Sequence, residues 1–286
     1  METGTRADLI GIFENTMERC GSDETLKKAV ASSVERQTVT FEKDPVPEPA
    51  PRFTTPANCV VSTRRSFEAA GPYSREGRKT CVLNFASFVT PGGGVTRGAG
   101  AQEESLCRNS TLYPALTADT AAPFYDAHNA AIAAGVSTRK NTHDCIYTPD
   151  IRVICDDSFF AAPLPEKEWY TVDVITCAAP DQRYDGERTY CPSDRELYDV
   201  FYERFCRIYD IAALHQADAV ITGAFGCGAF GNPPEVVAHA AKAATAKYLY
   251  HFSDIEFAIA GRYGAGPNYF AFRDILGIPE AGPVTE

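Results

Sequence analysis

Residues 80–105, TCVLNFASFVTPGGGVTRGAGAQEES, contain the clearest structural signals in this chain. The first eight, Thr80–Ser87, are an apolar run typical of a buried strand. A loop with five glycines follows, and a helix is predicted through residues 104–116. Residues 218–251 repeat this order of strand, glycine loop and helix. Both loops follow a strand, so we expect both at the carboxyl edge of one sheet, where ligands of open α/β sheets bind.

The rest of the chain extends the same alternation. Further strands are predicted within residues 59–63, 145–157, 170–180 and 255–261, and further helices over residues 6–20, 22–37, 194–216 and 232–251. Strands that alternate with helices indicate an α/β fold, with a mixed or parallel sheet between helices.

The first 56 residues have a different pattern. Two predicted helices are followed by the proline-rich segment Asp44–Pro56, which suits an extended connector and no regular element. We therefore divide the chain into an N-terminal helical extension with its connector, residues 1–56, and a main domain, residues 57–286.

The composition excludes several classes of function. The 286 residues carry a formal net charge of -11, so phosphate backbones and anionic membranes repel the chain, and we expect no general nucleic-acid binding. No apolar stretch reaches membrane-spanning length, and the charged N-terminus lacks the apolar core of a signal peptide. We expect a cytoplasmic protein that works as a monomer.

Cysteine and histidine spacing gives no metal or redox signal. None of the ten cysteines forms a C-x-x-C pair, and several lie in apolar runs, so we expect buried, reduced thiols. The five histidines show no ligand spacing. We expect no metal and no cofactor.

The first glycine loop is suited to an anionic sugar ligand. The glycines permit positive φ angles, and successive N–H groups can form an anion-binding nest. No Gly-Lys-Ser/Thr follows, which excludes a P-loop. The adjacent Glu103 and Glu104 cannot point the same way, so one can hold sugar hydroxyls while the other exchanges a proton. A solvated helix start is the alternative explanation of this pair.

The second loop, TGAFGCGAFGNPPE at residues 222–235, matches G-x-G-x-x-G and raises the alternative of a dinucleotide-binding dehydrogenase. Only one strand is predicted after its helix, whereas a dinucleotide fold needs several. The helix start has a local explanation, with Asn232 as cap, Pro233 in the first turn and Glu235 completing a capping box. What remains is a glycine turn beside a helix N-terminus, which suits a diphosphate.

These motifs resemble those of a known family. The run LNFASFVTPGGGVTRGAGAQEES resembles the signature of poly(ADP-ribose) glycohydrolases, and GCGAFGNPP resembles the diphosphate loop of that family and of macrodomains. The N-terminal helices and motif order resemble the shorter bacterial-type members. The resemblance spans residues 5–276. It implies a macrodomain-like mixed β-sheet sandwiched between helices, with ADP-ribose in a cleft across the strand ends.

The resemblance also implies a role for each motif residue. Glu104 would protonate the 2′-oxygen of the leaving ribose and then, as a carboxylate, activate water. Glu103 would hold the ribose hydroxyls and Gln102 would brace the loop. The other expected contacts are Gly92, Gly93 and Gly94 to the diphosphate and nearby ribose, Asn84 to the ribose, and Gly226, Cys227, Gly228, Ala229 and Phe230 as the second phosphate wall, with Phe230 beside the distal ribose.

The adenine site is expected in the tail of the chain. Asn268 and Phe272 resemble the family's late Asn-and-aromatic segment, so we expect Phe272 to stack on adenine. A helix that buries its aromatic face explains the same residues equally well.

The predicted function is hydrolysis of poly(ADP-ribose) to ADP-ribose from chain ends, with ADP-ribosylated proteins as substrates. The alternatives are a mono-ADP-ribosyl hydrolase and a non-catalytic ADP-ribose-binding macrodomain. The Gln-Glu-Glu run argues against pure binding, which needs no proton donor. Neither loop contains lysine and Arg97 is their only arginine, so backbone N–H groups would hold the anion and binding should depend weakly on salt.

Overall fold

The computed structural model describes residues 5–136, 138–183, 190–261 and 264–277. Its centre is a seven-stranded sheet with the order β1-β4-β5-β3-β6-β7-β2. The strands are β1 (Thr38–Thr40), β2 (Asn58–Ser62), β3 (Thr80–Phe85), β4 (Cys145–Val153), β5 (Tyr170–Cys177), β6 (Ala219–Thr222) and β7 (Asp254–Ala258). The five strands from β5 to β2 are parallel, and β4 pairs antiparallel with both β5 and β1. The expected mixed α/β sheet is confirmed.

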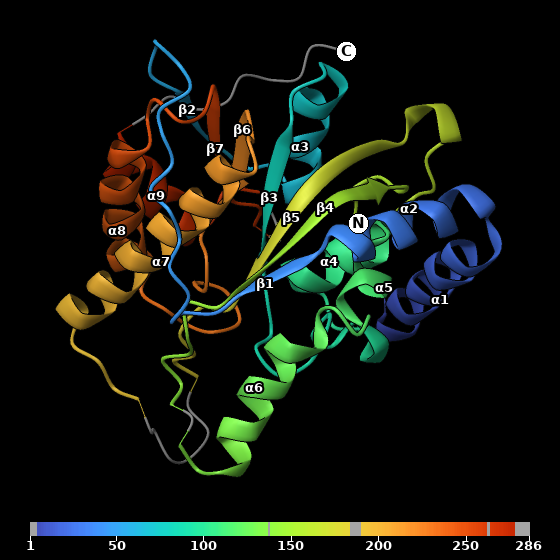
Figure 1. Ribbon diagram of the computed structural model, residues 1–286, viewed down its shortest axis with the longest axis horizontal. Helices are drawn as coiled ribbons and strands as arrows, with labels where there is room; N and C mark the ends of the chain where they lie inside the picture. The colour runs from blue at the N-terminus through green and yellow to red at the C-terminus, as the bar shows by residue number, and fades with distance from the viewer. Residues whose placement is uncertain (1–4, 137, 184–189, 262–263, 278–286) are drawn as a thin grey trace.

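Helices cover both faces of the sheet (Figure 1). One face carries α7 (Asp194–Leu214), α8 (Pro234–Lys247) and α9 (Pro267–Leu276). The other face carries α1 (Arg6–Ser22), α2 (Glu24–Arg36), α3 (Ser66–Arg75), α4 (Gln102–Asn109), α5 (Leu112–Leu116) and α6 (Ala122–Ala133). Two short 3-10 turns lie at Val95–Arg97 and Glu166–Glu168.

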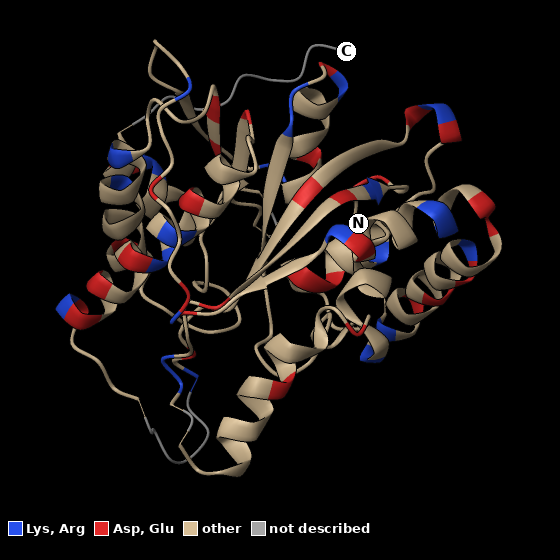
Figure 2. Cartoon of the chain, in the orientation of Figure 1, with Lys and Arg blue, Asp and Glu red and all other residues tan. Residues whose placement is uncertain are grey.

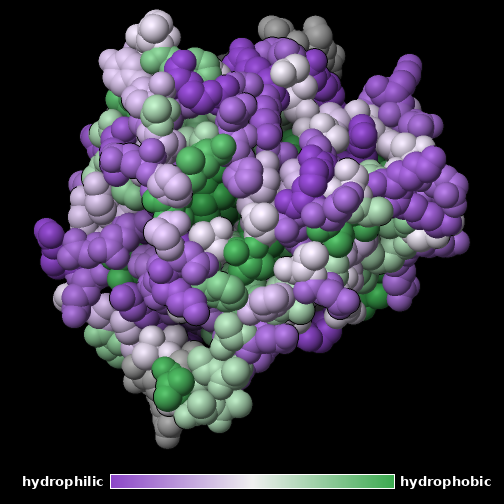
Figure 3. Space-filling model, in the orientation of Figure 1, coloured by the Kyte–Doolittle hydropathy of each residue, from purple (hydrophilic) through white to green (hydrophobic). Residues whose placement is uncertain are grey.

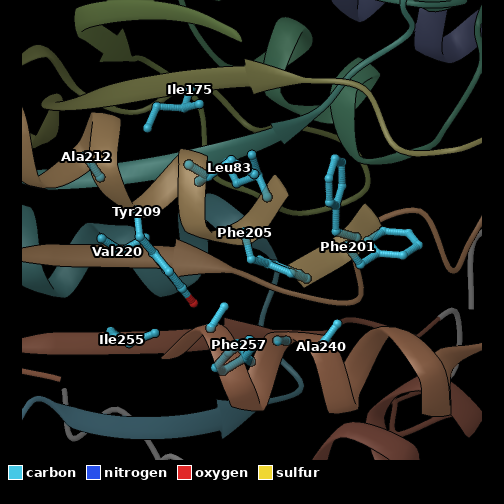
Figure 4. Packing of buried hydrophobic residues seen from close by; sticks show 14 of the residues in the cluster. Leu83, Ile175, Phe201, Phe205, Tyr209, Ala212, Val220, Ala240, Ile255 and Phe257 are labelled. Atoms are coloured by element: carbon cyan, nitrogen blue, oxygen red, sulfur yellow. The ribbon is translucent and has the colours of Figure 1, made fainter. Parts of the chain in front are cut away.

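The two helical layers rest on alternate residues of the central strands. In β3, Cys81 and Leu83 belong to the core on the side of α7 and α8, while Val82 belongs to the opposite core. Successive strand side chains point to opposite faces, so an unbroken apolar strand fits a sheet that is covered on both sides. Figure 4 shows Leu83 and Val220 beside the aromatic side chains of α7.

Several helix boundaries differ from the sequence prediction by a few residues, and two of the differences have a clear physical reason. The helix expected over residues 104–116 is interrupted at Ser110, which forms an antiparallel bridge with Val153. Pairing with β4 therefore overrides the local helix preference there. The second helix begins after Asp23, whose carboxylate accepts the N–H groups of Thr25 and Leu26.

The N-terminal segment joins the main sheet. β1 adds an edge strand to β4, and α2 packs against β4. Gln37 Nε2 donates to Thr148 Oγ1 at 2.7 Å, and Arg36 pairs with Asp150 at 2.7 Å. The sequence predicts no strand before residue 57, because the three residues of β1 are too few to show the alternating pattern of a strand.

The surface agrees with an acidic, globular protein. Charged residues lie mainly on the outer helices and the loops (Figure 2). In the same orientation hydrophilic residues cover most of the face, and apolar residues gather in limited patches near its middle (Figure 3). Among the residues that the structure describes, no helix has the length and apolar character needed to cross a bilayer.

Candidate active site

The two glycine loops meet at one edge of the sheet, as expected. β3 and β6 are parallel neighbours, so the loops that follow Phe85 and Thr222 leave the sheet side by side. They border a cleft of about 780 Å³. Six of the predicted site residues line it, namely Gln102, Gly226, Gly228, Ala229, Phe230 and Asn268.

Gln102 fixes the start of α4 to the end of β3. Its Oε1 accepts the N–H of Phe85 at 2.9 Å, and its Nε2 donates to Leu83 O at 2.8 Å and to Ser66 Oγ at 3.0 Å. Three bonds to two other elements leave the side chain no freedom. This geometry agrees with the expected bracing role.

Glu103 points back into the protein. It is 3% exposed, and its Oε2 accepts the N–H of Ser87 at 2.7 Å while its Oε1 accepts Asn84 Nδ2 at 3.3 Å. Burial raises the pKa of Glu103 to about 8, the charge of Glu104 adds to this, and the Ser87 N–H opposes it. Glu103 therefore retains its proton at neutral pH.

Asn84 contacts Glu103 in place of the expected ribose. The side chain is fully buried and does not line the cleft, and its Nδ2 also lies 3.2 Å from Thr176 Oγ1. Asn84 lies near the end of β3, the middle strand of the sheet, so neighbouring strands and α4 enclose its side chain. Asn84 thus orients Glu103 from behind.

Glu104 bonds a different backbone group from Glu103, although both carboxyl groups approach Gly93. Its Oε1 accepts the N–H of Gly94 at 2.8 Å. Its Oε2 is buried and has no hydrogen-bond partner among the described residues. A buried carboxylate oxygen without a partner is costly and is typical of a functional group that awaits a ligand.

The glycine triplet is required by its contacts with this pair. A Cβ on Gly93 would lie 2.6 Å from Glu104 Oε1 and 2.9 Å from Glu103 Oε2, and its φ is +60°. A Cβ on Gly92, with φ +66°, would lie 2.6 Å from the Tyr113 ring. The two carboxylates therefore flank one point above Gly93, where no side chain fits.

Two N–H groups of the glycine triplet, which we expected to contact the diphosphate, bond protein oxygens in this structure. The N–H of Gly93 donates to Thr90 O at 2.9 Å and closes a turn, while that of Gly94 donates to Glu104. Neither glycine lines the cleft. In this structure Gly93 leaves room for the two glutamates and Gly94 donates a hydrogen bond to Glu104. The contact of the triplet with a diphosphate therefore stays a prediction.

The second loop turns at Gly226, whose φ is +75°. A Cβ there would lie 2.5 Å from Ala179 Cβ, so the close approach needs glycine. The predicted cap at Asn232 was wrong. Pro233 takes the N-cap position of α8, while Asn232 Nδ2 donates to Pro180 O at 2.7 Å and Gly226 O at 2.8 Å. The amide holds two loops together and so cannot cap the helix.

Cys227 is structural. It is 9% exposed, its Sγ contacts Phe225 O at 3.7 Å, and burial strongly raises its pKa. A nucleophilic cysteine needs the opposite shift. All ten cysteines are free in the structure, and no group of three or more His, Cys, Asp or Glu within the described ranges is arranged to hold a metal.

The segment Asp181–Arg183, after β5, covers Phe230, a contact that the sequence analysis does not predict. The guanidinium of Arg183 lies 4.9 Å from the centre of the Phe230 ring, and Gln182 N donates to Phe230 O at 2.8 Å. Asp181 holds Arg183 through two bonds of 2.9 and 2.6 Å. Arg183 thus brings a cation close to the second phosphate wall.

Arg204 of α7 anchors the base of that loop. Its fully buried guanidinium donates to Ala178 O at 2.6 Å and to the carbonyls of Lys140 and Asn141 at 3.3 Å. Its Nε also lies 3.3 Å from His143 Nδ1. Burial and the charge of Arg204 lower the pKa of His143 to about 3, so the imidazole is neutral and accepts this bond.

The expected stacking of Phe272 on adenine was wrong. Phe272 is fully buried in the core of α7, α8 and α9, with its ring centre 5.9 Å from that of Phe257. Only Asn268 of this segment lines the cleft, and its Nδ2 donates to Cys227 O at 3.4 Å. The aromatic face of α9 packs on the sheet.

The cleft also has lining residues that the sequence analysis missed, among them Arg65 and Phe159.

A buried pair of carboxyl groups near a cleft at the strand ends is an arrangement suited to glycoside hydrolysis. The profile described as "Microbial-type PARG, catalytic domain" matches residues 11–156, just over half of the chain. The chain therefore belongs to the microbial-type poly(ADP-ribose) glycohydrolase family, whose members act on poly(ADP-ribose). Among curated proteins, none matches this sequence.

Solved structures agree with the family and extend the likeness over nearly the whole chain. The poly(ADP-ribose) glycohydrolase of Thermomonospora curvata is 25% identical with a TM-score of 0.82, over 94% of this chain and 99% of that one. The same enzyme bound to the inhibitor ADP-HPD gives a TM-score of 0.78 at 25% identity and the same coverage. The Deinococcus radiodurans enzyme in complex with ADP-ribose is 26% identical with a TM-score of 0.74, over 87% of this chain and 96% of that one.

Proposed function

We propose that this chain hydrolyses the ribose–ribose O-glycosidic bonds of poly(ADP-ribose) and releases ADP-ribose, with Glu104 as general acid and base. The observation that carries the proposal is the buried Glu104 Oε2, which has no partner among the described residues while Gly94 holds Oε1. A carboxyl fixed at one oxygen and free at the other is prepared to exchange a proton with a bound ligand.

The pair of glutamates supplies the proton. Burial raises the pKa of Glu103 to about 8, so the pair carries a proton at neutral pH. One oxygen of each carboxyl group lies near the same point above Gly93, and we infer that the proton passes from Glu103 to Glu104 when the substrate binds. Gln102 keeps the first turn of α4, and hence the pair, fixed to β3.

The reaction follows from this arrangement. Protonated Glu104 transfers its proton to the 2′-oxygen of the leaving ribose as the bond from that oxygen to the anomeric carbon breaks. The electron pair of the bond stays on the oxygen, and positive charge develops at the anomeric carbon. The Glu104 carboxylate then removes a proton from water, and the resulting hydroxide bonds to the anomeric carbon. The products are two free hydroxyl ends and a reprotonated Glu104.

Substrate orientation is assigned to the two loops. The Gly226–Phe230 loop provides backbone at the cleft surface for the diphosphate, beside the N-terminus of α8. Phe230 borders the distal ribose. We assign the contact with the ribose hydroxyls to Glu103, whose carboxyl group Ser87 and Asn84 hold in position.

We propose that cleavage proceeds from polymer ends. The Asp181–Arg183 segment packs on Phe230, which lines the cleft, and we infer that it limits the space beyond the distal ribose, which suits a terminal unit. Early products should then be free ADP-ribose, and early release of oligomers would contradict this mode. We further propose ADP-ribosylated proteins as substrates of a cytoplasmic monomer that needs no cofactor.

Glu104→Gln tests the assignment directly. We expect ADP-ribose release from polymer to fall about 10²–10⁴-fold, because the variant has no proton to give. The Kd for ADP-ribose should change little, since glutamine retains the shape and the Gly94 contact. Glu166→Gln, on an exposed turn, is the matched control and should behave as wild type.

The same assay separates the alternatives. Equal turnover by wild type and Glu104→Gln would refute the role of Glu104. Tight ADP-ribose binding by a wild type that leaves polymer intact would refute the proposed activity and favour a mono-ADP-ribosyl hydrolase or a non-catalytic binder.

A further inference from the structure

A carboxyl group that the proposed mechanism does not use lies beside the cleft. Asp157 belongs to the loop of residues 155–163 between β4 and β5, and it is one of the residues that line the cleft. Its carboxyl group accepts four hydrogen bonds from the protein, two at each oxygen. A carboxylate has about four acceptor positions. The bonding of Asp157 is therefore directed to the protein and not to a ligand.

One oxygen of Asp157 caps helix α3. Its Oδ2 accepts the N–H of Phe67 at 2.7 Å and the N–H of Glu68 at 3.4 Å, both in the first turn of α3. Such N–H groups have no partner within their own helix. The N-cap residue is Arg65, whose side chain has donors only and cannot accept them. The carboxylate of Asp157, 90 residues further along the chain than Phe67, supplies the cap instead, and the helix dipole favours its negative charge there.

The other oxygen of Asp157 holds helix α4. Its Oδ1 accepts the hydroxyl of Ser105 at 3.1 Å and the Nδ2 of Asn109 at 3.0 Å. These two residues are four positions apart, so they lie on one face of the helix. Ser105 directly follows Glu104 in the first turn of α4. One carboxyl group thus joins the start of α3 to the helix that carries the two glutamates.

These bonds oppose rotation of α4 about its own axis. Gln102 attaches the first residue of α4 to β3 and to Ser66 of α3. Ser105 and Asn109 follow Gln102 by three and seven positions and continue the same stripe of the helix. Attachment at three positions over two turns leaves the helix no free rotation, whereas attachment at its first residue alone would allow the rest of it to turn.

The position of Glu104 depends on this attachment. Its Oε1 accepts the N–H of Gly94, while its Oε2 has no partner among the described residues. The direction of the side chain therefore follows the orientation of α4. The outer radius of a helix with its side chains is about 5–6 Å, so a rotation of about 10° moves a carboxyl group by about 1 Å. A misplacement of about 1 Å can lower the rate of an enzyme about 10²-fold.

We propose that Asp157 is a positioning residue for hydrolysis: one oxygen bonds the start of α3, the other bonds Ser105 and Asn109 of α4, and together they keep Glu104 directed at the reacting bond. The proposal rests on the proposed function, because it takes Glu104 as the acid and base. Asp157 acts through α4 and contacts no reacting atom. Its loss should therefore lower kcat and leave the affinity for the ligand nearly unchanged.

The experiment measures kcat and KM on polymer and the calorimetric Kd for ADP-ribose. Asp157→Ala should lower kcat about 10- to 100-fold, with KM and Kd within about threefold of wild type. The double variant Ser105→Ala/Asn109→Ala removes the α4 partners alone and should lower kcat in the same way. Asp157→Asn should restore kcat to within about threefold of wild type, because its oxygen can accept the α3 N–H groups while its amide donates to α4. Asn109 can turn its own amide to accept that bond, since its Oδ1 has no partner among the described residues.

Asp156→Asn is the matched control for charge. Asp156 Oδ1 accepts the N–H and Oγ–H of Ser158 and the N–H of Ala162 within the same loop. Asparagine retains this oxygen and removes one negative charge beside Asp157. Its kcat should equal that of wild type.

Several outcomes would overturn the proposal. An equal loss of kcat in Asp157→Asn and Asp157→Ala would show that the charge matters and the bonds do not. A rise in KM and Kd at unchanged kcat would show that Asp157 contacts the ligand. If Asp157→Ala does not fold, the double variant decides, and a wild-type kcat there refutes positioning through α4.

Hydrogen exchange separates this proposal from the proposed function. Amide groups of α4 should exchange faster in the double variant than in wild type, whether or not polymer is a substrate. Unchanged exchange would overturn the role of Asp157. A wild type that cleaves no polymer, with faster exchange in the double variant, would contradict the proposed function and leave the attachment of α4 established.

Discussion

Replacing Glu103 with glutamine should change how the stability of this protein depends on pH. Glu103 is 3% exposed, and burial raises its pKa from an ordinary 4.5 to about 8. Below pH 4.5 the carboxyl is neutral in the folded and unfolded chains, so it adds no pH dependence. Between these two values the unfolded chain loses the proton while the folded chain keeps it, and the free energy of unfolding falls as pH rises.

The magnitude follows from that interval. At 1.36 kcal/mol per pH unit, the step from 4.5 to about 8 corresponds to about 5 kcal/mol. Relaxation and water penetration reduce such penalties, so we expect about 2–4 kcal/mol in solution. Glutamine is neutral throughout and removes this loss. Relative to wild type, Glu103→Gln should therefore gain stability steadily from pH 5 to pH 8.

Urea unfolding followed by the fluorescence of Trp169, the single tryptophan, can measure this difference. Other titrating groups are common to both proteins and cancel in the comparison. Glu14→Gln, on the exposed side of α1, is the control and should show no such gain. A difference between Glu103→Gln and wild type that stays constant from pH 5 to pH 8 would refute the argument.

Three further substitutions test the packing of the site. Gly93→Ala places a Cβ 2.6 Å from Glu104 Oε1 at a φ of +60°, so we expect a loss of about 1–2 kcal/mol in urea unfolding and at least about tenfold lower polymer turnover; Gly228→Ala meets nothing within 4 Å and should keep wild-type stability. Arg204→Met leaves the carbonyls of Lys140, Asn141 and Ala178 without this donor and should cost about 3–5 kcal/mol by the same measurement, and a cost below about 1 kcal/mol would refute this account of the loop anchor. Phe272→Leu should lower stability by about 1–3 kcal/mol while the calorimetric Kd for ADP-ribose stays unchanged, and a large change in Kd would restore the stacking role that the structure rejects.

The sequence predicts those elements whose residue pattern extends over only a few neighbouring positions. The strand through Cys81–Phe85 and the loops after β3 and β6 are visible because apolar runs and glycines act within a few residues. The carboxyl edge of a parallel sheet then brings both loops together without further information. Glu103 and Glu104 bond different backbone N–H groups, which agrees with the expectation that adjacent helical residues leave the helix in different directions.

What could not be predicted depends on contacts between distant residues. The break at Ser110 requires Val153, and the position of Asn232 requires the carbonyl of Pro180. The spacing of the aromatic residues in α9 is the same whether they face a ligand or the core. Only the packing of α9 on the assembled sheet shows that Phe272 belongs to the core. Two adjacent phenylalanines in a loop, at residues 159–160, were the available hint of exposed aromatic surface near the cleft.

The short pairing between β1 and β4 has a consequence for solubility. β4 is the long outer strand of the main sheet, and without β1 and α2 its backbone edge would offer unpaired N–H and C=O groups to another molecule. A chain shortened to begin at Ala57 would keep every residue assigned to chemistry here, yet it would expose that edge. The segment before residue 57 therefore protects the protein against edge-to-edge aggregation.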